Sequence, residues 1–393
     1  DSSEPLLISR DEEAQRMDSL VLPSPHALVL FAKNKSNPCD LESFSETLLS
    51  WLTFVLHKIP PTTMSKTYRV GVIGYGLSAK VFHIPFIQAA ANLELGAIVQ
   101  GQGDEAREQH PGCSVYKTSD ELFADGSIDL VVLSTPPTSH FELAAGALNA
   151  GKHVVVEKPF CPTSAECDEL ITLAKSKGKL LVPFQNRRWD ADYVTLQKVL
   201  SEGKLGRVVE FASHYDRYDP EVSSRDAKDA PGAGVIYDLG THLLDQILNL
   251  YGVPSRVTGF LSKQRANAPA EGAYDACSVL LHYEPGPLVT VKATPISVGE
   301  EQLRFWVRGD KGSFKKYGID PQEPQFIGGM KLSDPEFGVE PATSAVAQDG
   351  KIEVTTVENV PPPTYGEFYK LLTGALEGQN PVPVKAEEAR DLI

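Results

Sequence analysis

The chain has 393 residues, of which 41% are hydrophobic and 23% charged, so it is long enough for two or three globular domains with a sizeable core. Its 37 basic and 52 acidic residues give a formal net charge of -15, which repels phosphate backbones and anionic headgroups, and we expect no nucleic-acid partner and no membrane partner. The five cysteines are odd in number and lack a C-x-x-C pair, which argues against a disulfide framework or zinc cage and predicts a reducing, cytoplasmic location.

Residues 1–63 mix Pro, Ser and Asn with scattered leucines and show no sustained hydrophobic period. Their most apolar run, TLLSWLTFVL at 47–56, is about half as long as a membrane helix and follows an acidic stretch, so it predicts neither a membrane span nor a signal peptide. This leader is either a regulatory or docking arm or a disordered or non-native tail without a role. We favour the second interpretation.

A regular alternation of strand and helix begins at Met64. The predicted strands are YRVGVIG (68–74), LELGAIV (93–99), IDLVVLST (128–135) and KHVVVEKP (152–159), and the predicted helices are VFHIPFIQAAA (81–91), SDELFAD (119–125) and HFELAAGALNAG (140–151). The strands are continuously apolar rather than alternating, which indicates burial on both faces. Residues 64–185 are therefore predicted to form a doubly wound, parallel Rossmann domain.

The turn after the first strand carries glycines at the spacing of a dinucleotide fingerprint, Gly74-x-Gly76-x-x-Ala79. One glycine makes the tight turn, the next admits the pyrophosphate to backbone N–H groups, and the small third residue lets helix and strand pack closely. A glycine turn between strand and helix also has a purely structural interpretation, but the strand before it and the helix after it favour a cofactor. The predicted contacts are Gly74, Tyr75, Gly76, Leu77 and Ala79.

The end of the second strand bears on which dinucleotide is bound. An NAD site usually has an Asp or Glu about 20 residues after the glycines, whereas residues 100–103 read QGQG and the first acid is Asp104. Gln100 therefore leaves room for a 2′-phosphate. No basic residue stands at the strand end itself, and Arg107, a turn further on, is the nearest candidate.

Lys158 follows the last predicted strand of this domain. A lysine at the carboxyl end of a central strand lies at the crevice where such sheets bind ligands. The alternative is a surface lysine before a turn proline.

The second half of the chain, 186–393, has a different hydrophobic pattern. A helix, ADYVTLQKVLSEG, precedes LGRVVEFASHYDRY and several nearly alternating runs, such as ACSVLLHYEPG and PLVTVKATPI, joined by Gly and Pro turns. This pattern is typical of a mainly antiparallel sheet with one covered face. We therefore predict an α+β domain with an open sheet.

The most informative helix of this domain is predicted from GVIYDLGTHLLDQILNLYG (234–252). Asp238, His242, Asp245 and Asn249 fall on one helical face, opposite an apolar face. A solvated face usually carries Lys and Glu, so a histidine flanked by carboxylates favours an acid/base pair. Two ligands at i and i+4 could also hold a metal, but no third His or Cys has matching spacing, and we predict none.

Five motifs taken together resemble one family. They are GYGLSAKVFHIPF, STPPTSH, AGKHVVVEKPF, FQNRRWD and GVIYDLGTHLLDQ. In this order they resemble the glucose-fructose oxidoreductase / inositol dehydrogenase / rhizopine catabolism (Gfo/Idh/MocA) family, and within it the NADP-dependent scyllo-inositol dehydrogenase-like branch. The resemblance covers residues 66 to 393.

The resemblance implies roles for particular residues. Lys158, Asp238 and His242 would form the catalytic triad, and Thr135, Pro136, His140, Glu157 and Pro159 would lie near the cofactor. The Lys158–Pro159 peptide is expected to be cis. The open sheet would serve oligomer contacts, in a homodimer or homotetramer, and NADP would be preferred by a small factor with NAD tolerated.

Two departures from the family pattern stand out. The loop after the second strand lacks the serine/arginine pair that NADP-using relatives often show, and the chain ends at EEARDLI, where relatives continue through a terminal helix. We therefore expect a truncated C-terminal helix.

The predicted reaction transfers a hydride between a nicotinamide and a secondary alcohol or carbonyl of a sugar or polyol. His242 would act as base, Lys158 would stabilise the developing alkoxide and Asp238 would orient the histidine or a substrate hydroxyl. Asn186, Arg187, Tyr215 and Asp216 are candidates to hold the substrate, although core or surface roles are equally compatible with their positions. The alternative is a non-catalytic, dinucleotide-binding regulator of the same family.

Overall fold

The computed structural model describes residues 66–222, 228–339, 342–348, 351–358, 360 and 365–393. The leader predicted over 1–63 lies outside these residues. Within the described part of the chain, no helix has both the length and the apolar character needed to cross a membrane.

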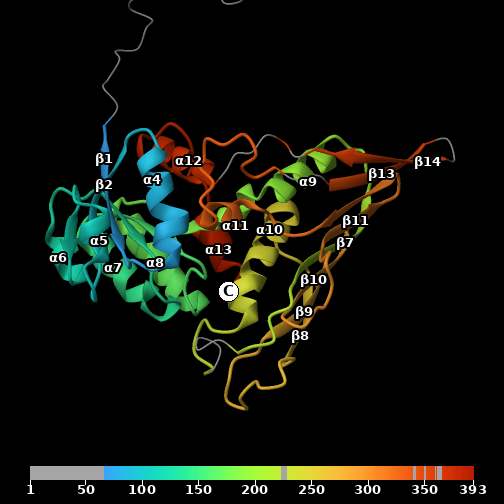
Figure 1. The fold of residues 1–393 in the computed structure, drawn as a ribbon, viewed down its shortest axis with the longest axis horizontal. Coiled ribbons are helices and arrows are strands. Elements are labelled where there is room, and N and C mark those ends of the chain that lie inside the picture. The colour runs from blue at the N-terminus through green and yellow to red at the C-terminus, as the bar shows by residue number, and fades with distance from the viewer. Residues whose placement is uncertain (1–65, 223–227, 340–341, 349–350, 359, 361–364) are drawn as a thin grey trace, which may run out of the picture. The chain divides into compact units, whose positions relative to one another are not determined.

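A six-stranded, entirely parallel sheet forms the first layer (Figure 1). Its strands are β1 (Tyr68–Ile73), β2 (Leu93–Val99), β3 (Ser114–Tyr116), β4 (Leu130–Leu133), β5 (His153–Glu157) and β6 (Leu181–Phe184), in the spatial order β3-β2-β1-β4-β5-β6. The predicted Rossmann fold is confirmed. Sequence reasoning missed β3, which is too short to show a period, and β6, whose Pro183 is tolerated because β6 is an edge strand.

Helices cover both faces of this sheet. The segments that follow β1 to β5 are η2 (Ala79–His83) with α4 (Ile84–Ala89), α5 (Glu105–Gln109), α6 (Ser119–Ala124), η3 (Pro137–Ser139) with α7 (His140–Asn149), and α8 (Ser164–Lys177). One buried cluster joins alternate strand residues such as Val70 and Val72 to α4, and a second joins Val131 and Val154 to α6, α7 and α8. This two-sided burial explains the continuously apolar strands.

The second sheet has eight strands and is antiparallel except for one pair, β7 with β10. Its strands are β7 (Val208–Asp216), β8 (Arg256–Ser262), β9 (Ala276–His282), β10 (Leu288–Thr294), β11 (Leu303–Gly309), β12 (Gly312–Tyr317), β13 (Ala342–Gln348) and β14 (Lys351–Val357). The helical segments of this half are η4 (Asn186–Trp189), α9 (Ala191–Ser201), η5 (Ile236–Gly240), α10 (Thr241–Tyr251) and α11 (Gln322–Ile327).

One face of the eight-stranded sheet is buried under α9 and α10, where Leu196 and Leu243 pack against Phe211 and Val291. Trp306 and Phe260 are more than a third exposed, at 38% and 65%. The predicted α+β domain with an open, mainly antiparallel sheet is thus confirmed.

The end of the chain returns to the first layer. Phe368 and Tyr369 of α12 (Gly366–Leu376) are buried in the same cluster as β1 and α4, and Ala386 and Ala389 of α13 (Ala386–Arg390) are buried with α8. The boundary expected from sequence assigned all of 186–393 to the second domain, whereas 365–393 pack on the Rossmann layer. Apolar spacing identifies a helix but does not identify its partner.

The strand order positions the site. The chain winds one way from β1 to β2 and β3 and the other way from β4 to β5 and β6, so the order reverses between β1 and β4. Ligands of open parallel sheets bind at this reversal, beyond the carboxyl ends of the strands. Gly74 follows β1, Ser134 follows β4, and Lys158 follows the neighbouring β5.

Candidate active site

The glycine turn has the shape that a pyrophosphate requires. Gly74 has φ +96°, and a Cβ there would lie 2.2 Å from the carbonyl oxygen of Ser134, so only glycine is accommodated. A Cβ at Gly76 would meet no atom within 4 Å, which leaves open space above the turn. Ala79 is fully buried against the sheet. The residues of the fingerprint therefore fit a bound dinucleotide.

The two side chains within the turn differ in their surroundings. The Tyr75 hydroxyl donates to Gln109 Oε1 at 2.6 Å and lies 3.0 Å from His110 Nε2, while burial raises its pKa. Leu77 is 62% exposed. Tyr75 thus helps to fix the turn, and Leu77 is available for an apolar contact.

A basic side chain that the sequence did not indicate lies against the loop after β2. Gln100 Oε1 accepts a hydrogen bond from the backbone N–H of Ala106, which places its side chain at the start of α5. Lys117, just after β3, donates to the carbonyl oxygen of Gly103 at 2.7 Å and to Asp104 Oδ1 at 3.0 Å. A cation therefore lies against the QGQG loop, but it comes from a strand that the sequence analysis did not predict.

The segment after β4 is held from behind by His140. This histidine is fully buried, and its Nδ1 and Nε2 each lie 2.9 Å from a carbonyl oxygen, of Pro159 and Thr135 respectively. Thr135 Oγ1 accepts from Ser139 Oγ, and Pro136 is the residue that precedes η3. His140 thus joins the loops after β4 and β5, and its place near the cofactor stays a prediction.

Lys158 reaches across to the second domain. Its Nζ donates to Asp238 Oδ1 at 2.8 Å and to the Asp238 carbonyl oxygen at 2.9 Å. The peptide bond between Lys158 and Pro159 is cis, as predicted. Glu157, the preceding residue, is buried and accepts from the Lys158 backbone N–H at 2.9 Å.

His242 lies one turn beyond Asp238. It is 5% exposed, and its Nδ1 has no hydrogen-bond partner among the described residues. Burial, together with the positive charges of Lys158, Arg187 and Arg304, holds the pKa of His242 well below its usual value. The ring is therefore neutral at physiological pH, and one of its two nitrogens is a hydrogen-bond acceptor.

The predicted polar stripe does not act as one unit. Asp238 lies in η5, a π-helical turn, whereas Asp245 and Asn249 lie in α10. Asp245 forms a buried, bidentate ion pair with Arg188, and Asn249 Oδ1 accepts from the Tyr193 hydroxyl at 2.8 Å. The far half of the stripe therefore stabilises packing against η4 and α9, whereas Asp238 contacts Lys158.

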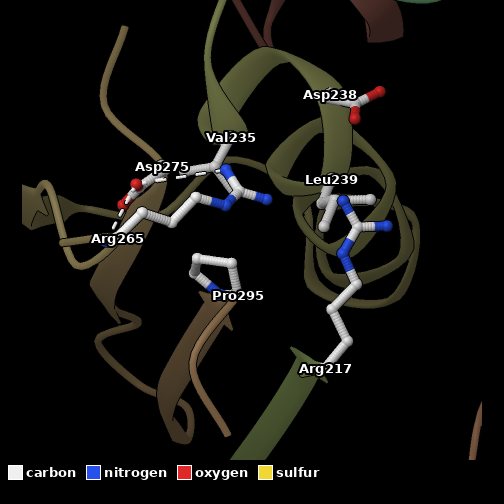
Figure 2. A pocket seen from close by; sticks show the side chains of 7 residues that line it. All are labelled: Arg217, Val235, Asp238, Leu239, Arg265, Asp275 and Pro295. Atoms are coloured by element: carbon white, nitrogen blue, oxygen red, sulfur yellow. Dashed lines mark hydrogen bonds and ion pairs between the residues drawn. The ribbon is translucent and has the colours of Figure 1, made fainter. Parts of the chain in front are cut away.

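A pocket of mixed character adjoins Asp238 (Figure 2). It is lined by Arg217, Val235, Asp238, Leu239, Arg265, Asp275 and Pro295. In Figure 2 the Arg217 side chain extends from the end of β7 towards Leu239, and Arg265 lies beside Asp275. Arg265 donates to Asp219 Oδ2 at 2.9 Å, whereas the Arg217 guanidinium is 3.6 Å from the same carboxylate.

The four residues expected to hold the substrate are divided by the structure. Asn186 and Arg187 are buried; Arg187 donates to Glu323 Oε2 at 2.7 Å and to the Tyr215 hydroxyl at 3.3 Å. Tyr215 is buried on the helix-covered face of β7, but Asp216 bonds to His214 at 2.9 Å on the opposite face. Successive strand residues point to opposite faces, so Tyr215 and Asp216 do not share one face of β7, and a substrate role for either stays a prediction.

Arg217 and Lys117 are the candidate functional residues that sequence reasoning missed. Arg217 shares the face of Tyr215, since it lies two residues on, and that alternation was the signal that could have identified it.

No group of three or more potential metal ligands is found within the described residues.

Comparisons with known proteins agree with this geometry. Residues 68–184 match the model described as "Oxidoreductase family, NAD-binding Rossmann fold", and residues 193–315 match "GFO/IDH/MocA C-terminal domain". An uncharacterized oxidoreductase of Schizosaccharomyces pombe is 41% identical over 81% of this chain and 93% of its own length. The scyllo-inositol 2-dehydrogenase (NADP(+)) of Bacillus subtilis is 34% identical over 83% of this chain and 91% of its own.

A solved structure extends the likeness to three dimensions. The protein yvaA of Bacillus subtilis is 33% identical, with a TM-score of 0.79 over 84% of this chain and 93% of its own. One family thus matches both the Rossmann layer and the second domain. The chain belongs to the Gfo/Idh/MocA oxidoreductases and is a dehydrogenase or reductase with an NAD(P)-binding Rossmann domain.

Proposed function

We propose that this protein transfers a hydride between NADP(H) and a secondary alcohol or carbonyl group of a sugar or polyol. The observation that carries the proposal is the contact of Lys158 Nζ with Asp238 Oδ1, beside the neutral ring of His242. In the proposal, the Lys158 ammonium, the Asp238 carboxylate and the His242 ring act together beyond the carboxyl end of β5, which Lys158 follows. The names of relatives support the substrate class, since one is a scyllo-inositol 2-dehydrogenase and another an inositol 2-dehydrogenase.

Each residue of this group has a distinct role in the proposal. The nicotinamide, when bound, accepts or supplies the hydride. His242 takes the hydroxyl proton during oxidation and returns it during reduction, because its ring is neutral and so has a nitrogen that can accept a proton. Lys158 stabilises negative charge on the substrate oxygen, and Asp238 holds the ammonium in place.

The pocket of Figure 2 is the proposed substrate pocket. Asp275 and Asp219 balance the positive charge of Arg265. Arg217 is the better candidate to donate to substrate oxygens, because its closest acidic contact is at 3.6 Å. Leu239 and Val235 provide the apolar surface on which a ring carbon face packs.

The proposed preference for NADP rests on the loop after β2. This loop has no carboxylate at Gln100 to bind a ribose diol, and Lys117 places a cation against Gly103. Lys117 also pairs with Asp104, so we expect the preference to be small, with NAD tolerated.

We also propose that the chain forms a homodimer or homotetramer through the outer face of the eight-stranded sheet. Trp306 and Phe260 expose large apolar side chains there, and such exposed apolar surface is common at protein–protein interfaces.

A reducing, cytoplasmic location remains a prediction, in keeping with unpaired thiols at the four described cysteines.

An absorbance screen at the reduced-nicotinamide band tests the proposal. The purified chain is incubated with NADP or NAD and a panel of inositols, aldoses and ketoses, with Lys158→Ala as the blank. We expect turnover with at least one polyol or sugar that is lost in the variant. Cofactor binding without turnover on the whole panel would instead identify a dinucleotide-binding regulator.

A further inference from the structure

The histidine of the GYGLSAKVFHIPF motif has no part in the chemistry described above. His83 is fully buried, at the end of the helical turn that follows the glycine loop. Its Nε2 lies 3.0 Å from Glu157 Oε1 and its Nδ1 lies 2.6 Å from the hydroxyl of Tyr369. The ring packs against Phe184 with centroids 4.3 Å apart, so its orientation is fixed.

Glu157 receives hydrogen bonds from three directions. Oε1 accepts from His83 and from the hydroxyl of Ser78, and Oε2 accepts from the backbone N–H of Lys158 at 2.9 Å. Burial by itself raises the pKa of Glu157, but the bonds from His83 and Ser78 outweigh it, and the pKa is lowered. The side chain is therefore a carboxylate, which only accepts hydrogen bonds.

One proton position on His83 follows from this, because Nε2 must carry the proton that the carboxylate accepts. Burial raises the pKa of Tyr369 well above its usual value, so its hydroxyl remains protonated where it bonds to Nδ1. A continuous set of hydrogen bonds thus joins Tyr369, His83 and Glu157.

This series of hydrogen bonds ends at two functional segments. Ser78 lies within the glycine turn, directly before Ala79, and Lys158 directly follows Glu157. We infer that His83 is a positioning residue: through Glu157 it fixes the lysine loop against the dinucleotide-binding turn, and so holds the Lys158 ammonium where hydride transfer needs it. This inference rests on the proposed role of Lys158.

Two substitutions at one position separate positioning from packing. His83→Phe keeps a planar ring of similar size but removes both nitrogens. His83→Gln retains an amide N–H that can donate to Glu157. If His83 only fills space, His83→Phe should disturb Lys158 less than His83→Gln does. If His83 directs Glu157, His83→Gln should disturb Lys158 less.

A readout on Lys158 itself needs no substrate. The acetylation rates of Lys158 and Lys152 by acetic anhydride are measured by mass spectrometry in the wild type and both variants. Lys152 is the internal control, because it is buried and its Nζ donates to the Ile128 carbonyl oxygen at 2.8 Å. We expect Lys158 to react several-fold faster in His83→Phe, at the wild-type rate in His83→Gln, and Lys152 to be unchanged throughout.

The kinetic readout uses a substrate found in the absorbance screen. We expect His83→Phe to lower kcat by about 10- to 100-fold, the scale of a small misplacement of a reacting group, with KM little changed and kcat largely restored in His83→Gln. Equal acceleration of acetylation at Lys152 and Lys158, or wild-type kcat in folded His83→Phe, overturns the inference.

Two further outcomes are also decisive. If His83→Phe does not fold, Glu157→Gln replaces it, since it keeps the size and removes the charge; wild-type acetylation and kcat in that variant refute the inference. If the wild type turns over nothing on the panel, the proposed function fails, and the acetylation rates still decide whether His83 positions Lys158.

Discussion

Lys158 and Asp238 stand 80 residues apart in the chain, and their side chains meet at 2.8 Å. Lys158 follows a strand of the Rossmann sheet, whereas Asp238 lies in the π-helical turn of the second domain. The ion pair therefore joins the two halves at the proposed reaction site. It is also partly exposed, at 19% and 26% for the two side chains, so a substrate oxygen can reach the ammonium.

Replacing Lys158 by alanine tests its role in turnover. We expect turnover to fall by about 10²-fold or more, the usual scale for a positioned charged group, while dinucleotide affinity changes only a few-fold. Steady-state kinetics and cofactor titration measure the two effects. Lys175→Ala is the matched control, because Lys175 pairs with Glu387 on the surface and should leave turnover intact. Turnover equal to wild type in Lys158→Ala would refute the assignment.

The pH dependence of alcohol oxidation tests His242. Because burial and nearby positive charges lower its pKa, the ascending limb of the rate should have its midpoint below the usual value of about 6.5. His242→Ala should lower the rate and flatten this limb. His214→Gln, on the outer face of β7, is the control and should preserve the profile. An unchanged profile in His242→Ala would assign the base elsewhere, most directly to Lys158.

The free energy of unfolding should decrease at acidic pH because of His153. Burial lowers the pKa of this histidine to about 4, and its Nδ1 accepts the backbone N–H of Leu180, which favours the neutral ring. The unfolded chain binds the proton first, near pH 6.5, so the free energy of unfolding should decrease as pH falls from about 6.5 to 4. Urea unfolding at several pH values measures this. His153→Asn keeps an acceptor and does not titrate, so its slope should be shallower; equal slopes would contradict the prediction.

Cofactor choice can be shifted at the loop after β2. Gln100→Asp introduces the carboxylate that an NAD site uses, so we expect the affinity ratio to move towards NAD. Lys117→Ala removes the cation against Gly103 and should weaken NADP more than NAD. Titration of both cofactors into each variant measures the ratios, with Gln379→Glu as a control for added charge. Tighter binding of NAD than NADP by the wild type would show that the preference was misassigned.

Arg217 should determine substrate affinity. Loss of a hydrogen bond from a charged donor costs about 1.5–3 kcal/mol, so Arg217→Met should raise KM by about 10-fold or more with a smaller effect on kcat. Arg207→Met is the control, because Arg207 pairs with Asp310 on the surface. A normal KM in Arg217→Met would place the substrate outside the pocket of Figure 2.

Sequence by itself determined the features that depend on neighbouring residues. The apolar strands, the turn from Gly74 to Ala79 and the helix around His242 each follow from a local pattern of spacing and side-chain type. For this reason the Rossmann fold, the second sheet and the position of Lys158 at a strand end could all be predicted.

Tertiary structure decided the features that depend on contacts between residues distant in the sequence. Only the fold shows that Asp245 is taken by Arg188, that Asp216 points to the outer face, that α12 and α13 pack on the first sheet, and that Lys117 lies against the QGQG loop. Packing also buries His242 and thereby lowers its pKa. Burial and charge environment arise from segments distant in sequence, and a periodic pattern holds no information about which distant segment supplies them.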